Sequence, residues 1–166
     1  GPGNCLLDSW IRQKTKNRYD KNGLVARSGK VNKILLDQSL DFYFNNEIIN
    51  KRSYDINDFD ISTFRGLTVE DGAATIVEYT IEIIANKITS KNIIVCGGGR
   101  KNKYLLERLE NKIKNKIVNI DDFKIDGDFV ESQAFAYLAI RSLLNLDISF
   151  PSTTGCNNDT TGGTII

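Results

Sequence analysis

The chain has 166 residues, of which 40% are hydrophobic and 26% are charged, and these proportions are ordinary for one globular domain. Its 22 basic and 21 acidic residues leave a net charge of +1, so charge gives no reason to expect nucleic acid or a membrane surface as a partner. The three cysteines are far apart and no apolar run is long enough to span a membrane, which argues against a disulfide framework, a zinc site and a transmembrane helix and favours a reducing, cytoplasmic setting.

Two residue types are missing from the sequence, histidine and methionine. Without histidine, the chain lacks the commonest general base and metal ligand. Without methionine, it does not read as a complete primary translation product. We therefore expect a segment that begins partway through a larger protein.

The N-terminal residues predict a glycine loop that leads into a helix. Asn4 follows Gly1, Pro2 and Gly3 and occupies the N-cap position, where the loop and the first-turn N–H groups could hold a phosphate. Four apolar residues then share one helical face: Leu6, Leu7, Trp10 and Ile11. The alternative is that the first two residues remain from the removal of a tag.

The next part of the chain is polar. Residues 14–30 alternate charges with Asn and Gly, so we expect a surface loop with a turn at residues 19–23. An amphipathic segment follows at residues 31–40, before three aromatic residues. Residues 51–60 are rich in turn formers and either line a sugar or connect two helices, and their composition favours the connector.

A long amphipathic helix is predicted after Thr68. Thr68 and Asp71 resemble a capping box, with Asp where Glu or Gln is usual. The apolar positions that mark the helix are Val77, Ile81, Ile84 and Ile88. We expect this helix to dock on the strand that follows.

The stretch at residues 93–102 combines a strand, a glycine turn and a helix start. A β-branched run, read as a strand covered on both faces, ends at Gly97, Gly98 and Gly99, and Asn102 can cap a helix with apolar residues at helical spacing. Glycine tolerates positive φ and lets a ligand approach bare backbone, so a nucleotide is plausible here. The alternative, a tight turn that only needs small residues, stays open.

A second short strand is predicted at residues 116–120, and residues 126–128 open another helix. This helix is apolar nearly all round, which predicts a central position. Glu131 lies three residues after Asp128, so a capping role is favoured over catalysis. The tail from Pro151, rich in Thr and Gly, predicts a loop.

Only two strands are convincing among this many helices, and parallel strands normally belong to larger sheets. We therefore expect further strands before residue 1. A sheet truncated in this way would leave an open edge, and such an edge tends to recruit another strand, so self-association is a further expectation.

Short motifs follow one another over nearly the whole chain: Gly1-Pro2-Gly3-Asn4, Leu7-Asp8-x-Trp10, Asp20-x-x-Gly23, Ser28-Gly29-x-Val31, Asp41-x-Tyr43-Phe44, Leu67-Thr68, Cys96-Gly97-Gly98-Gly99-x-x-Asn102, Ala134-Phe135-Ala136 and Pro151-x-Thr153-Thr154-Gly155. In order and spacing this series resembles anhydro-N-acetylmuramic acid kinase.

The resemblance implies an ATP-dependent sugar kinase of the actin-like (ribonuclease H-like), two-lobed α/β fold, with Mg²⁺ as the metal. Such an enzyme opens the anhydro ring of a recycled cell-wall sugar with water while phosphorylating it, and releases N-acetylmuramic acid 6-phosphate. The chain would be one domain, residues 1–166, forming most of the helix-rich, nucleotide-side C-terminal lobe. The implied nucleotide-binding residues are Gly1, Gly3 and Asn4 on the phosphate side, and Gly97, Gly98, Gly99 and Asn102 on the nucleoside side.

The chain also departs from the family pattern. The resemblance places the catalytic aspartate just before Gly1 and the rest of the sugar site in an N-terminal lobe, so we expect no turnover by this chain alone. Ile56 stands where the family tends to have Arg, which leaves the sugar contacts at residues 52–56 open. The alternative hypothesis is a degenerate, non-catalytic nucleotide-binding or scaffold module.

Overall fold

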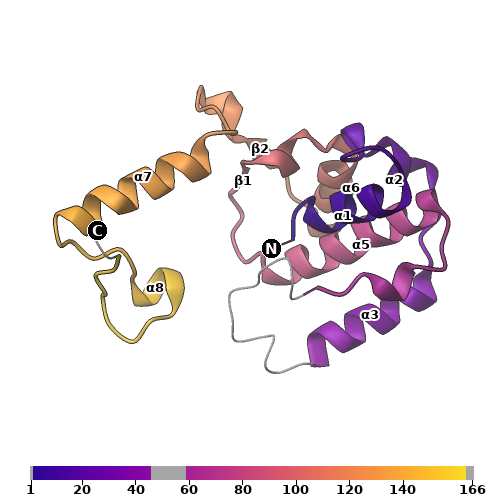
Figure 1. The fold of residues 1–166 in the computed structure, drawn as a ribbon, viewed down its shortest axis with the longest axis horizontal. Helices are drawn as coiled ribbons and strands as arrows, with labels where there is room; N and C mark the ends of the chain where they lie inside the picture. The colour runs from indigo at the N-terminus through magenta and orange to yellow at the C-terminus, as the bar shows by residue number, and fades with distance from the viewer. Residues whose placement is uncertain (1, 46–58, 164–166) are drawn as a thin grey trace.

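The structure is a computed structural model that describes residues 2–45 and 59–163 (Figure 1). It is a helix-rich α/β structure with a small parallel sheet. Its helices and strands, in chain order, are α1 (Cys5–Lys14), α2 (Leu24–Ser28), α3 (Lys33–Asn45), α5 (Val69–Lys87), β1 (Ile93–Val95), α6 (Lys103–Ile113), β2 (Ile117–Asn119), α7 (Val130–Leu143) and α8 (Pro151–Thr154).

Helix α5 is the centre of the helical core and packs against α1, α2, α3 and α6 (Figure 1). The predicted cap is confirmed, because the Thr68 hydroxyl accepts a hydrogen bond from the N–H of Asp71 at 3.1 Å. The predicted apolar face of α1 is buried too. Trp10, at 0% exposure, lies over Gly72 and donates its indole N–H to the Val69 carbonyl at 2.9 Å. The core is thus mainly helix packed on helix.

The prediction of a surface loop at residues 14–30 is wrong for its second half. The turn is present, since Asn22 and Gly23 both have positive φ, but α2 follows at once and packs on α5. Both carboxylate oxygens of Asp20 accept hydrogen bonds from the first turn of α2, from the N–H groups of Val25 and Ala26 at 2.9 Å. Ala26 is fully buried. A polar local composition therefore concealed a packed helix.

Strands β1 and β2 pair in parallel, with Ile93 opposite Ile117, and α6 connects them. The predicted order of strand, glycine turn, helix and strand is confirmed. However, Ile94 is 52% exposed, so the expectation that the first strand is covered on both faces is wrong. Within the described residues the sheet has two strands, and too little packs on the face that carries Ile94 to bury it.

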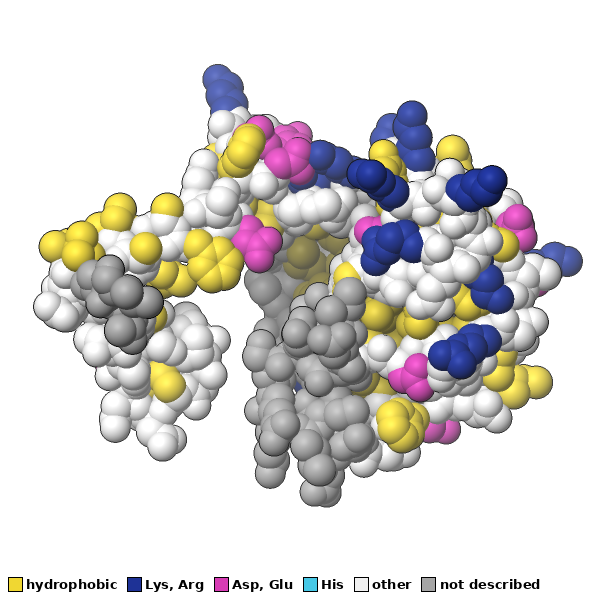
Figure 2. Space-filling model, viewed as in Figure 1, with side chains coloured by type: hydrophobic (Ala, Val, Ile, Leu, Met, Phe, Trp, Pro, Cys, Tyr) yellow, Lys and Arg dark blue, Asp and Glu magenta, His cyan; other side chains and the backbone are white. Residues whose placement is uncertain are grey.

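Helix α7 is not central, contrary to the prediction. It extends away from the helical core together with α8, and it has no buried residue (Figure 1). Hydrophobic side chains are exposed along it (Figure 2), among them Phe135 at 64% and Leu143 at 61%. The apolar residues of α7 favour burial, but the described part of the chain does not cover them. The tail predicted as loop contains the short helix α8 and an antiparallel bridge between Ser149 and Thr160.

All three cysteines are free thiols. Among the described helices, none is long and apolar enough to cross a membrane.

Candidate functional site

The two glycine loops, far apart in the sequence, meet in the structure through asparagine side chains. The Asn102 side-chain amide donates to Asn4 Oδ1 at 3.0 Å, and Asn4 Nδ2 donates to the Gly98 carbonyl at 3.3 Å. Asn102 also caps α6 as predicted, since its Oδ1 accepts from the N–H of Leu105 at 3.1 Å. With 2% of its surface exposed, Asn102 is a buried joint between the loops.

The predicted N-cap position of Asn4 is confirmed, although its side chain does not bond to the first turn of α1. Asn4 stands at the N-cap position, but its backbone has helical angles and its side chain makes no cap hydrogen bond. The physical reason is competition: the amide that would bond to the first turn is instead engaged by Asn102 and Gly98. The Asn4 side chain consequently accepts no hydrogen bond from the N–H groups in the first turn of α1.

The glycine loop at residues 97–99 is open toward solvent. Gly97 has φ of 70°, which favours glycine, but Gly98 and Gly99 do not have positive φ. A Cβ built on any of the three would meet no atom within 4 Å, and the same holds at Gly3, whose φ is 49°. At Gly98 and Gly99, therefore, neither backbone strain nor packing inside the chain requires glycine. Gly1 lies outside the described residues.

A cavity of about 610 Å³ lies beside these loops, a volume typical of small-molecule sites. Its walls come from the start of α1, from the turn before α2 and from the glycine loop. The charged side chains that line it are the cations Arg12, Arg18, Lys21 and Lys101 and the carboxylates Asp8 and Asp20. The excess of cations suits an anionic ligand, and Tyr19 adds an exposed aromatic ring.

The two carboxylates of the cavity have different environments. Asp20 is 5% exposed and both of its oxygens bond to the backbone of α2, which accounts for it structurally. Asp8 is half-buried one turn into α1. Burial raises the pKa of the Asp8 carboxyl, with nearby Arg12 lowering it and Asp20 raising it further. Burial therefore disfavours the ionised form of Asp8.

Sequence reasoning found the loops but missed the cavity wall. The cations that line it at residues 18–21 belong to the stretch interpreted as a solvated loop. A local signal was available, because an Asp five residues before Val25 can cap the helix that starts there. The predicted capping role of Glu131, with Asp128 at the start of the helix, is wrong: α7 begins after Phe129 without a side-chain cap. The Asp128 carboxylate binds Arg100 and Lys101 instead. Residues 52–56, with the open question of sugar contacts, lie outside the described part of the chain.

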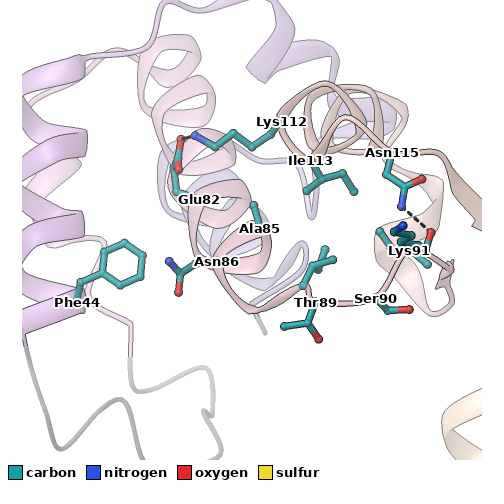
Figure 3. Close-up of a pocket in the computed structure, with 12 residues that line it drawn as sticks. Phe44, Glu82, Ala85, Asn86, Thr89, Ser90, Lys91, Lys112, Ile113 and Asn115 are labelled. Carbon is teal, nitrogen blue, oxygen red and sulfur yellow. Dashed lines mark hydrogen bonds and ion pairs between the residues drawn. The ribbon is translucent and has the colours of Figure 1, made fainter.

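A second cavity, of about 470 Å³, lies between the C-terminal ends of α5 and α6 (Figure 3). Two of its charged side chains pair with each other, since Lys112 lies 2.5 Å from Glu82. Asn115 donates its side-chain amide to the Lys91 carbonyl, also at 2.5 Å (Figure 3). This arrangement binds helix ends to each other, and we assign no ligand to it.

Comparisons with known proteins show the family to which this chain is related. The family model for anhydro-N-acetylmuramic acid kinase matches residues 1–166. Kinases described by that name are similar to this chain: one from Pelagibacter ubique is 48% identical, with 100% of this chain and 47% of the relative covered. Another, from Zymomonas mobilis, is 39% identical over 99% of this chain and 46% of the relative. The chain therefore spans about half the length of these relatives, and by the extent of the match it belongs to the anhydro-N-acetylmuramic acid kinase family.

Proposed function

We propose that this chain is the nucleotide-binding C-terminal lobe of an ATP-dependent sugar kinase with the actin-like, two-lobed fold. Residues 1–166 would form a single domain of it. The complete enzyme would open the 1,6-anhydro ring of anhydro-N-acetylmuramic acid with water and phosphorylate the sugar, giving N-acetylmuramic acid 6-phosphate in peptidoglycan recycling. We assign nucleotide contacts to residues of the two loops: Gly1, Gly3, Asn4, Gly97, Gly98, Gly99 and Asn102.

The observation that carries this proposal is the open surface over Gly98 and Gly99. Glycine is costly to order in a folded chain, and neither the backbone angles nor the neighbouring atoms of the described residues require it at these two positions. Close approach of a ligand to the backbone supplies the missing reason. The loop also leads into α6, whose N-terminal N–H groups favour a polar or anionic group.

The residues present suit ATP and leave magnesium to the nucleotide. Four cations face the cavity against two carboxylates, so the site attracts a triphosphate. Among the described residues there is no cluster of three or more His, Cys, Asp or Glu side chains that could hold a metal ion. Mg²⁺ commonly binds through substrate phosphates, with one or two carboxylates at most. When bound with ATP it would neutralise phosphate charge, while the loops orient the nucleotide.

We further propose that catalysis needs a second lobe. Asp20 caps α2, and the Asp71 carboxylate accepts the N–H of Lys30 at 2.7 Å, so neither serves as the base that activates water. Phosphoryl transfer depends on holding nucleophile, metal and phosphate together. The relatives are about twice as long as this chain, and the apolar side chains exposed on α7 offer a surface on which their remaining half would pack.

The test of nucleotide binding compares two glycines with the same free space. Gly98 and Gly66 both lack positive φ, and a Cβ would meet nothing within 4 Å at either. We expect the unaltered chain to bind ATP with a Kd of about 1 mM, or about −4 kcal/mol, since half of a cleft leaves the ligand solvated. Gly98→Val should weaken this binding and Gly66→Val should not, by NMR titration with ATP and Mg²⁺. Equal binding by both variants would leave the loop as a turn only.

The rival function, a non-catalytic nucleotide-binding or scaffold module, has the same fold and the same loops. An assay for sugar phosphate separates the two. The chain alone should give none, whereas the chain mixed with a polypeptide covering the other half of the relatives should give product. Absence of product from a correctly assembled mixture would favour the scaffold.

A further inference from the structure

Arg100, in the glycine loop, is a buried cation that does not line the cavity. Its side chain is 5% exposed. Nε donates to Asp121 at 2.9 Å and Nη1 to Asp128 at 2.5 Å, while Nη2 lies 3.7 Å from Asp126. Three carboxylates around one guanidinium leave it no charge to offer a phosphate.

Arg100 also holds the glycine loop directly. Its Nη1 donates to the Gly97 carbonyl at 3.0 Å, and the N–H of Gly97 donates to the Gly127 carbonyl at 2.9 Å. The N–H of Gly127 in turn donates to Asp121 Oδ1 at 2.8 Å. Both polar groups of Gly97 are therefore fixed by one network, named here the Arg100 clamp and formed by Arg100, Gly97, Asp121, Gly127 and Asp128.

The clamp is closely packed as well as charged. A Cβ at Gly127 would lie within 3.0 Å of Arg100 Nε, so the backbone of this segment fits against the guanidinium. Hydrogen bonds from Arg100 lower the pKa of Asp121 and, together with Lys101, the pKa of Asp128 to about 2. Both carboxylates are thus ionised at neutral pH, and the clamp is fully formed there.

Lys101 behaves differently from its neighbour. It lines the cavity and is 60% exposed, although its Nζ reaches Asp128 at 2.6 Å. An exposed lysine can turn toward an anion at little cost, whereas Arg100 would have to break its contacts with Asp121, Asp128 and Gly97. The two adjacent cations are therefore suited to different tasks.

We propose that Arg100 is a positioning residue of the nucleotide site, which holds the glycine loop open through Gly97 and does not contact phosphate, and that Lys101 is the phosphate-facing cation. This inference rests on the proposed nucleotide binding at the same loop. It gives a specific signature. A positioning defect weakens every nucleotide by one factor, whereas loss of a phosphate contact weakens ATP more than ADP and adenosine.

The test uses NMR titrations of the full chain with adenosine, ADP and ATP. Arg100→Lys keeps the charge but loses the fork that spans the carboxylates, and should raise all three Kd values by the same factor, roughly fivefold. Lys101→Met should raise the Kd for ATP most. Asp121→Asn decides the sign, because Asp121 accepts from Arg100 Nε and from the N–H of Gly127 but does not contact Lys101. The variant should weaken binding with the clamp broken, whereas an Arg100 that served as a phosphate ligand would be released and bind ATP more tightly.

Arg108→Lys is the matched control, because Arg108 also makes two hydrogen bonds to a carboxylate, that of Glu78, but does not touch the glycine loop. If Arg100 were purely structural, Arg100→Lys would lower the melting temperature without changing the Kd of any nucleotide. That result would overturn the proposal. If the unaltered chain binds no nucleotide, the proposed function fails and hydrogen exchange of the Gly97 N–H still judges the clamp. Faster exchange in Arg100→Lys than in Arg108→Lys supports it, and equal exchange refutes it.

Discussion

The Asn4–Asn102 bridge should couple the two loops energetically, and a double-mutant cycle measures this coupling. Asn102→Ala removes the α6 cap, about 1 kcal/mol, and the bridging hydrogen bond, about 1 kcal/mol, so the free energy of unfolding should fall by about 2 kcal/mol. Asn4→Ala loses the same bridge and an exposed 3.3 Å bond to Gly98, for about 1 kcal/mol. The double variant loses the bridge only once and should also cost about 2 kcal/mol, which gives a coupling energy of about 1 kcal/mol.

Urea unfolding followed by tryptophan fluorescence is the assay, because Trp10 is the single tryptophan of the chain and is fully buried. The control cycle pairs Asn4→Ala with Thr68→Ala, which removes the cap of a different helix, α5. Those two costs should add to within about 0.5 kcal/mol. If Asn4→Ala and Asn102→Ala add equally well, the bridge carries no coupling and the loops are held together by other contacts.

Three further predictions concern charge and association. Arg100 and Lys101 hold the pKa of Asp128 at about 2, so the stability that its carboxylate gives is present above the unfolded pKa of about 4 and should be lost between about pH 4 and 2. In urea titrations at different pH values, Asp128→Asn should reduce this loss of stability at acid pH. The pH dependence from Asp8 has the opposite sign, because burial raises the pKa of its carboxyl. Stability is lost as the pH rises through the unfolded and then the folded pKa of Asp8, so Asp8→Asn should raise the melting temperature at pH 7. In the described part of the chain β1 and β2 pair only with each other, and their outer edges should recruit a second copy, so the sedimentation coefficient should rise with concentration. A return to the monomer value in Phe135→Glu would assign the contact to α7 instead.

The parts of the fold that could be predicted from sequence depend on local chemistry. The Thr68 and Asn102 caps use hydrogen bonds over three residues, and the buried face of α1 follows from the spacing of its apolar residues. The two strands were equally local, each a β-branched run next to a turn. These signals need no knowledge of what lies across the molecule.

The failures share a different property, which is competition or packing from a distant segment. Asn4 is at the predicted N-cap position, but its side chain bonds to Asn102, 98 residues away, and not to the helix that it precedes. Helix α2 lies in a stretch that is polar as a whole, but the helix fits against α5 so closely that a Cβ on Gly29 would collide with the Glu70 backbone. For α7, the apolar pattern gives the demand for burial but not the partner that meets it. The cavity was missed for the same reason, since its three walls come together only in the fold.

Hydrogen bonds within the chain already hold the described residues of both loops, and this bears on what limits the affinity of the proposed site for a nucleotide. Asn102 binds one loop to the other, and Arg100 fixes both polar groups of Gly97. A nucleotide would therefore spend little free energy on ordering the backbone that receives it. Weak binding would then reflect the surface of the ligand left in water and not a disordered site. On this reasoning a second lobe raises affinity by covering the nucleotide, and the positions of Gly98 and Asn102 should change little when it does.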